Sequence, residues 1–156
     1  VSDTIIPYAT ARKMGWDVDF VGSIATYNGY SAAAKGGVTE GFMAMTGFQM
    51  AYGDSEDPLV RNWYNGYKEK FGKNPDFPSQ LGYIFADMTV IALENAGRDL
   101  TVDKLVEGFE QIKGYRDIFG GPVQSFGPDK RQGSNESFLS QVQNGRWVRI
   151  GQNIGY

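Results

Sequence analysis

Apolar and polar positions follow different periods along the chain and divide it into three parts. At the start, apolar side chains recur roughly once per helical turn over residues 2–14, which predicts a helix with Gly15 just past its end. Pro7 fits such a helix only within its first turn. Residues 19–23, with Phe20 and Val21 at their centre, then predict a short strand, so the chain opens as an α/β unit.

Two more elements complete the first part. Residues 31–37 predict a short helix that ends at glycines, and residues 39–48 predict a second strand. The centre of that strand is continuously apolar, which is typical of a sheet covered on both faces.

The middle part carries three helical patterns with clear start and stop signals. Residues 58–71 follow Asp57 as N-cap, with Pro58 at the first helical position. A second helix is predicted with Ser79 as its N-cap and Gly97 at its end, and its length and apolarity predict that it is largely buried. A third, amphipathic helix is capped by Thr101 and ends at Gly114.

The helical period disappears after residue 115. Residues 120–133 combine short β segments with turns, and residues 137–150 predict a β-hairpin around Asn144–Gly145. Asn-Gly between alternating side chains is the signal for a two-residue primed turn.

The loop that follows the first predicted strand is unusual. Residues 23–30 combine small, hydroxyl-bearing and aromatic side chains instead of the residues of a plain turn. Ligands of open α/β sheets bind outside the carboxyl ends of the strands, so this composition favours small-molecule binding. The alternative is a surface loop built around the Asn28–Gly29 turn.

Composition excludes several classes of protein. The chain has 156 residues, 41% hydrophobic and 21% charged, which is typical of an ordinary globular domain, and 14% aromatic, which is high. A net charge of −3 leaves no basic footprint for nucleic acid. No apolar run approaches the length of a membrane helix. No signal peptide is visible, although a start at Val1 without Met is compatible with removal of a leader or more.

Missing residue types limit the chemistry further. The chain contains neither Cys nor His, which excludes disulfides, thiol nucleophiles, a Ser-His-Asp triad and histidine or thiolate metal sites. Carboxylates three apart, at 107 and 110 and at 54 and 57, are interpreted as a solvated helix face and a cap. We therefore expect a binding module rather than an enzyme, with no cofactor and no metal.

The ordered set of segments resembles one family, the extracytoplasmic substrate-binding proteins of ABC importers, of the branched-chain amino-acid and amide type. Four stretches carry the likeness: ARKMGWDVDFVGS, TEGFMAMTGF, the helical stretch from DPLVRNWYNGYKEKFG to ALENAGRD, and the closing QNGRWVRI. This resemblance implies a type I periplasmic-binding-protein-like α/β fold, with parts of two three-layer α/β/α lobes joined by hinge crossovers.

The likeness covers only the later part of such a protein and implies how the chain is divided. Residues 1–47 would belong to the second lobe, residues 48–135 to the first lobe, and residues 136–156 to a hairpin that closes the second lobe. The opening units of the first lobe would be missing. The chain would then expose sheet edges and apolar helix faces and would need the missing N-terminal part of the same protein or a second chain as a partner.

The resemblance also implies where a ligand would lie. The family's loop after this strand lines the cleft between the lobes, and in amino-acid binders it supplies an acid for the ligand ammonium. Here residues 23–26 contain no Asp or Glu, and the implied ligand-binding residues are Ser23, Ile24, Ala25, Thr26, Tyr27, Phe77 and Pro78. Ile24 stands where the acid would be, which favours an aromatic or aliphatic acid over an α-amino acid as ligand.

The leading hypothesis is the solute-binding subunit of a bacterial ABC importer, which closes two lobes over a small organic ligand and meets a membrane permease. Its location would be periplasmic, or extracytoplasmic with a membrane tether. A ligand-sensing receptor or regulator domain on the same fold is the alternative.

Overall fold

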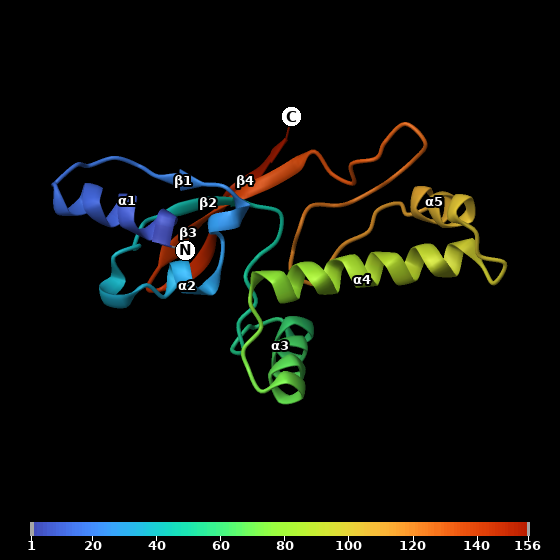
Figure 1. The fold of residues 1–156 in the computed structure, drawn as a ribbon, viewed down its shortest axis with the longest axis horizontal. Helices are drawn as coiled ribbons and strands as arrows, with labels where there is room; N and C mark the ends of the chain where they lie inside the picture. The colour runs from blue at the N-terminus through green and yellow to red at the C-terminus, as the bar shows by residue number, and fades with distance from the viewer. Residues whose placement is uncertain (1, 156) are drawn as a thin grey trace.

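The computed structural model describes residues 2–155 and shows a sheet unit beside a helical unit (Figure 1). The sheet unit combines the first and last parts of the chain: residues 2–47 and 136–155. The helical unit comprises residues 58–112. Two connections join them, at 48–57 and at 113–135, and the second loops out on the side of α5 before it reaches β3 (Figure 1).

Four strands form one sheet in the order β1-β2-β3-β4. β1 (Val21–Gly22) runs parallel to β2 (Met43–Thr46), whereas β3 (Glu136–Gln143) is antiparallel to both β2 and β4 (Arg146–Gly155). The carboxyl ends of β1 and β2 therefore lie at the same edge of the sheet. Both predicted strands of the first part are shorter than expected, and β2 alternates buried and half-buried positions instead of being covered evenly.

The hairpin is confirmed, including its turn. Asn144 and Gly145 have φ values of 53° and 73°, as a primed two-residue turn requires. The register shifts between Ser137 and Leu139, which marks a bulge in β3. Beyond it, residues 151–155 of β4 are exposed.

Short helices accompany the sheet. α1 (Ser2–Lys13) precedes β1, and Pro7 lies inside it rather than in its first turn. The loop after β1 contains the 3₁₀ turn η1 (Ile24–Thr26) and then α2 (Gly29–Ala32), capped by Asn28. A second 3₁₀ turn, η2 (Lys35–Gly37), follows, so the predicted helix at 31–37 is in fact two shorter pieces.

The helical unit follows the start signals in the sequence. α3 (Pro58–Phe71) begins at Asp57, whose side chain accepts a hydrogen bond from the N–H of Leu59. α4 (Phe77–Ala96) begins three residues earlier than predicted, because its N-cap is Asp76 and not Ser79, which is instead the reciprocal partner of a capping box. α5 (Val102–Glu110) is capped by Thr101 as predicted, and ends before Gly114.

α4 is less buried than its sequence predicts. Ile84, Met88 and Ala92 face the core, but several large apolar side chains on other sides of the helix are exposed: Tyr83, Phe85, Val90 and Leu93. A sequence pattern shows that a helix is apolar on several faces, but only the neighbouring elements decide which faces are covered.

α4 and α5 touch through a glycine. A Cβ added at Gly108 of α5 would lie 2.2 Å from the carbonyl oxygen of Ala92 in α4, so the two helices would have to move apart to accommodate it. We expect Gly108→Ala to lower the free energy of unfolding by about 1–3 kcal/mol, the usual cost of overpacking. Gly66→Ala in α3 is the matched control, because nothing lies within 4 Å of its added Cβ.

The control substitution is expected to raise stability by about 0.5–1 kcal/mol through helix propensity. Chemical denaturation of the full-length protein that contains these residues measures both changes. Equal effects of the two substitutions would contradict a close contact at Gly108.

Candidate functional site

The loop after β1 folds back over the end of its own strand. Thr26 donates from Oγ1 to the carbonyl oxygen of Ser23 at 2.7 Å and from its N–H to the same oxygen at 2.9 Å. A Cβ at Gly22 would lie 2.2 Å from Thr26 Oγ1, so only glycine fits beneath this turn. Ser23, Ile24 and Ala25 are consequently exposed at the carboxyl end of the strand, with 42% of Ile24 open to solvent.

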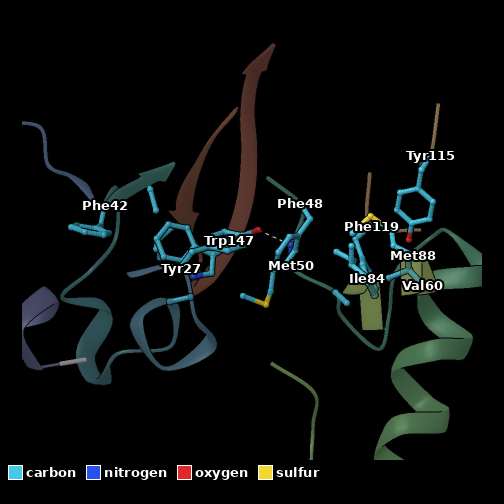
Figure 2. Close-up of a cluster of buried hydrophobic side chains, with 14 of the residues drawn as sticks. Tyr27, Phe42, Phe48, Met50, Val60, Ile84, Met88, Tyr115, Phe119 and Trp147 are labelled. Atoms are coloured by element: carbon cyan, nitrogen blue, oxygen red, sulfur yellow. Dashed lines mark hydrogen bonds between the residues drawn. The ribbon is translucent and has the colours of Figure 1, made fainter. Parts of the chain in front are cut away.

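Tyr27 is buried, whereas the prediction places it at the surface of the ligand site. Its ring is only 1% exposed and lies among buried rings in Figure 2, 4.9 Å from Trp147 and 6.2 Å from Phe48 between ring centres. The N–H of Met50 donates to the Tyr27 hydroxyl at 2.6 Å, and burial raises the pKa of that hydroxyl. The side chain is therefore a core residue in this arrangement, because an aromatic ring and a hydrogen-bond partner are both available inside the fold.

Phe77 and Pro78 form the first turn of α4, on the other side of Phe48. The Phe77 ring is half-buried and stacks on Phe48, with centres 5.5 Å apart and planes 15° apart, while Pro78 is exposed. One ring of the first connection thus separates Phe77 from Tyr27. The structure brings the loop and the start of α4 close to the same ring, but not into direct contact through these two side chains.

Gln80 is a residue that sequence reasoning missed. It is 1% exposed, and its carboxamide binds both sides of the first connection: Nε2 donates to the carbonyl oxygen of Gln49 at 2.9 Å, and Oε1 accepts from the N–H of Ala51 at 3.0 Å. The available signal was its place one turn before Ile84, on the face of α4 that turns inward. A polar residue on such a face needs an internal partner.

The same connection is tied to the hairpin. Arg146 forms two hydrogen bonds with the carboxylate of Asp54, at 2.6 and 2.7 Å, which lowers the pKa of that carboxyl group. Its guanidinium carbon lies 4.0 Å from the ring centre of Tyr52, whose hydroxyl accepts from the N–H of Trp147 at 2.7 Å. Residues 52–54 are therefore attached to the start of β4, next to the turn of the hairpin.

The second connection passes close to the first at Asp117. Its Oδ1 accepts from the N–H groups of Phe119 and Gly121 at 2.7 and 3.3 Å, and burial raises the pKa of the carboxyl group. A Cβ at Gly121 would lie 2.5 Å from the carbonyl oxygen of Gly47, and the N–H of Gln49 donates to Phe119 at 3.0 Å. The two connections are therefore in backbone contact just after β2, where the first of them leaves the sheet.

A hollow of ≈ 470 Å³ lies between the two units, beneath α2. It is bounded by α2 on one side and residues 74–76 on the other, and its aromatic members are Tyr30, Tyr52 and Tyr64. Of the described residues that line it, Asp76 is the one carboxylate, and none is Lys or Arg. A hollow of this size holds a small organic molecule.

The predicted ligand residues lie outside this lining. Residues 23–26 are at the strand end just before α2, and Phe77 follows Asp76 directly, so the hollow and the predicted site share a boundary rather than the same side chains. A second hollow of ≈ 540 Å³ is lined by the two connections and the start of α3, away from α2.

Residues 2–155 show neither a metal site made of acidic side chains nor a membrane-spanning helix. They contain no group of three or more acidic side chains arranged to hold a metal ion. None of their helices combines the length and apolarity needed to span a membrane.

A profile of the periplasmic binding protein family matches residues 2–146. A search of curated proteins finds no significant match. Among solved structures, the chain is similar to a branched-chain amino acid ABC transporter protein from Thermus thermophilus with bound valine, at 17% identity and a TM-score of 0.78, over 96% of this chain and 42% of that one.

Two further structures are similar over 99% of this chain. One is a fatty acid ABC transporter substrate-binding protein from Thermomonospora curvata, with 22% identity, a TM-score of 0.77 and 41% of its length covered. The other is an ABC transporter solute-binding protein from Rhodopseudomonas palustris in complex with 3,4-dihydroxybenzoic acid, with 15% identity, a TM-score of 0.74 and 42% covered. The chain therefore spans less than half the length of the structures it matches.

Proposed function

Because this chain belongs to the periplasmic binding protein family, we propose that it is part of the solute-binding subunit of a bacterial ABC importer. Its role would be to bind a small organic molecule without turnover, outside the cytoplasm, and to deliver it to a membrane permease. The observation that carries the proposal is the family match over nearly the whole chain, joined to an exposed loop at the carboxyl end of β1, one of two parallel strands.

In this proposal the two units are parts of two lobes. The sheet unit would represent the second lobe, residues 48–135 would return to the first lobe, and the ligand would lie between them. Support comes from the sheet, which joins the first and last parts of the chain, and from the helices, which group separately (Figure 1). The hollow beneath α2 would be the part of the cleft that this chain encloses by itself.

The first lobe would be completed by further polypeptide, either the missing N-terminal part of the same protein or a second chain. The exposed apolar side chains of α4 support this, since Phe85 and Val90 are 55% and 52% open to solvent. Exposed apolar surface of this kind marks a region that another element covers. The similar structures are also more than twice as long as this chain.

The proposed ligand is an aromatic or aliphatic acid rather than an α-amino acid. Ser23–Thr26 present no carboxylate, and the exposed side chain at the strand end is Ile24. Asp76, the carboxylate that lines the hollow, lies outside this loop and accepts two backbone N–H groups at Oδ1. An ammonium would therefore find no free acid in this loop, and losing such a charge-assisted bond costs about 1.5–3 kcal/mol.

Calorimetry on the full-length protein tests the ligand class. We expect benzoate, 3,4-dihydroxybenzoate or octanoate to bind at least about tenfold more tightly than valine or leucine, the factor that corresponds to 1.4 kcal/mol. Micromolar binding of valine, with no binding of the acids, would contradict the proposed class while leaving the binding role intact.

A further inference from the structure

Asp76 holds together two parts of the molecule that are distant in sequence. Its Oδ1 accepts a hydrogen bond from the N–H of Phe77 at 2.8 Å, which caps α4. The same oxygen accepts from the N–H of Gly29, the first residue of α2, also at 2.8 Å. One carboxylate oxygen is therefore shared between the helical unit and the sheet unit.

This hydrogen bond crosses the edge of the hollow. Gly29 and Asp76 both line it, and both are half-buried. α2 directly follows the loop at 23–28, and Asp76 directly precedes Phe77. The bond therefore joins the two segments between which the ligand is proposed to lie.

The bond is also independent of the connections between the units. Neither Gly29 nor Asp76 belongs to residues 48–57 or 113–135, whereas Gln80 and Arg146 hold the first connection from either side. If the units move apart about these connections, the Gly29–Asp76 bond breaks while the contacts of Gln80 can persist. The bond is made in the arrangement that the structure shows, between two segments that neither connection contains.

We propose that the Gly29–Asp76 hydrogen bond is a latch that stabilises the closed arrangement of the two units and slows ligand release. The inference rests on the proposed function in one respect, that the ligand lies between the units. A contact made in only one of two conformations shifts their populations by its own free energy. A hydrogen bond to a charged acceptor corresponds to a shift of about tenfold.

Proline at position 29 removes the latch at its donor. Gly29→Pro deletes the N–H, and proline fits the first position of a helix. Asn28, the preceding residue, has φ −147° and ψ 162°, the extended backbone that a following proline requires. Gly29→Ala is the matched control, because it keeps the N–H and its Cβ would lie 3.4 Å from Asp76 Oδ1, an ordinary contact.

Distances between spin labels in the ligand-free, full-length protein test the latch directly. This chain has no cysteine, so labels can be placed through Lys35→Cys in η2 and Glu69→Cys in α3, both exposed. Gly29→Pro is expected to lower the ratio of short to long distances about tenfold, and Gly29→Ala is expected to leave it near that of the unaltered protein. Identical distance distributions for the proline variant and the unaltered protein would overturn the proposal.

Ligand kinetics provide the second measurement, with benzoate and valine as probes. Gly29→Pro is expected to raise the release rate about tenfold with little change in the association rate. An unchanged release rate for a probe that binds would also count against the latch. If neither probe binds the unaltered protein, the proposed ligand classes fail, but the label distances still decide the latch.

Asp76→Asn provides a second test of the latch in case the proline variant does not fold. The amide oxygen can still cap α4 and accept from Gly29, but without a charge, so its effect on the distances should have the same sign and be smaller. A larger effect of Asp76→Asn than of Gly29→Pro would place the role of Asp76 in capping α4 instead of in the contact with α2.

Discussion

Replacing Tyr27 with Ala is expected to lower the free energy of unfolding by about 3–5 kcal/mol, the range for a large aromatic side chain removed from a core. The ring is 1% exposed and packs between Trp147 and Phe48. Its removal leaves a cavity among rings that belong to the sheet unit and the first connection (Figure 2). Denaturant titration of the ligand-free, full-length protein measures the loss.

Two companion variants divide this effect into its causes. Tyr27→Phe keeps the ring but leaves the Met50 N–H without its acceptor, and should cost about 1–3 kcal/mol. Tyr30→Ala, three residues further on and 74% exposed, should change stability by no more than about 0.5 kcal/mol. If Tyr27→Ala left stability unchanged and weakened ligand binding alone, the ring would be a ligand contact and its burial here would not represent the free protein.

Gln80→Met is expected to destabilise the full-length protein by about 2–5 kcal/mol, since it leaves the buried N–H of Ala51 and the part-buried carbonyl oxygen of Gln49 without their partner. Methionine has nearly the same length and shape but offers nothing to the N–H of Ala51 or the carbonyl oxygen of Gln49. The substitution therefore removes the attachment of the first connection to α4 while keeping the packing.

Gln111→Met is the matched control, because this glutamine is exposed just beyond α5. The same chemical change there should alter stability by no more than about 0.5 kcal/mol. Thermal or chemical unfolding compares the two, and hydrogen exchange locates the effect: the Ala51 amide should lose protection in Gln80→Met. Retained protection at Ala51 would contradict the role given to Gln80.

The contacts of the first connection suggest how the two units are held in position relative to each other. Gln80 holds residues 49 and 51 from the helical side, while Tyr27 and Arg146 hold residues 50 and 54 from the sheet side. Alternate residues of one segment are thus bound by opposite units. The Gly29–Asp76 bond lies outside this segment, which makes it the better candidate for a contact that opens and closes.

Local signals in the sequence correctly predicted the elements that depend only on neighbouring residues. Asp57 and Thr101 begin α3 and α5, and Asn144–Gly145 forms the hairpin turn, because caps and tight turns are decided by side chains within a few positions of the backbone they bind. The loop after β1 was also recognisable as an exposed strand end. The family resemblance of the whole chain is confirmed by the profile match over residues 2–146.

Only the tertiary structure decided which side chains of these elements meet. Tyr27 looked like a cleft residue by its place in an exposed loop, but its partners are Met50 and Trp147, the latter 120 positions away in the chain. The sequence showed only that Gln80 lies on an inward face of α4 and that Asp76 precedes this helix; their partners in residues 49, 51 and 29 belong to other segments. Side-chain type and spacing determine local conformation, whereas burial and pairing depend on contacts between segments that the local pattern does not contain.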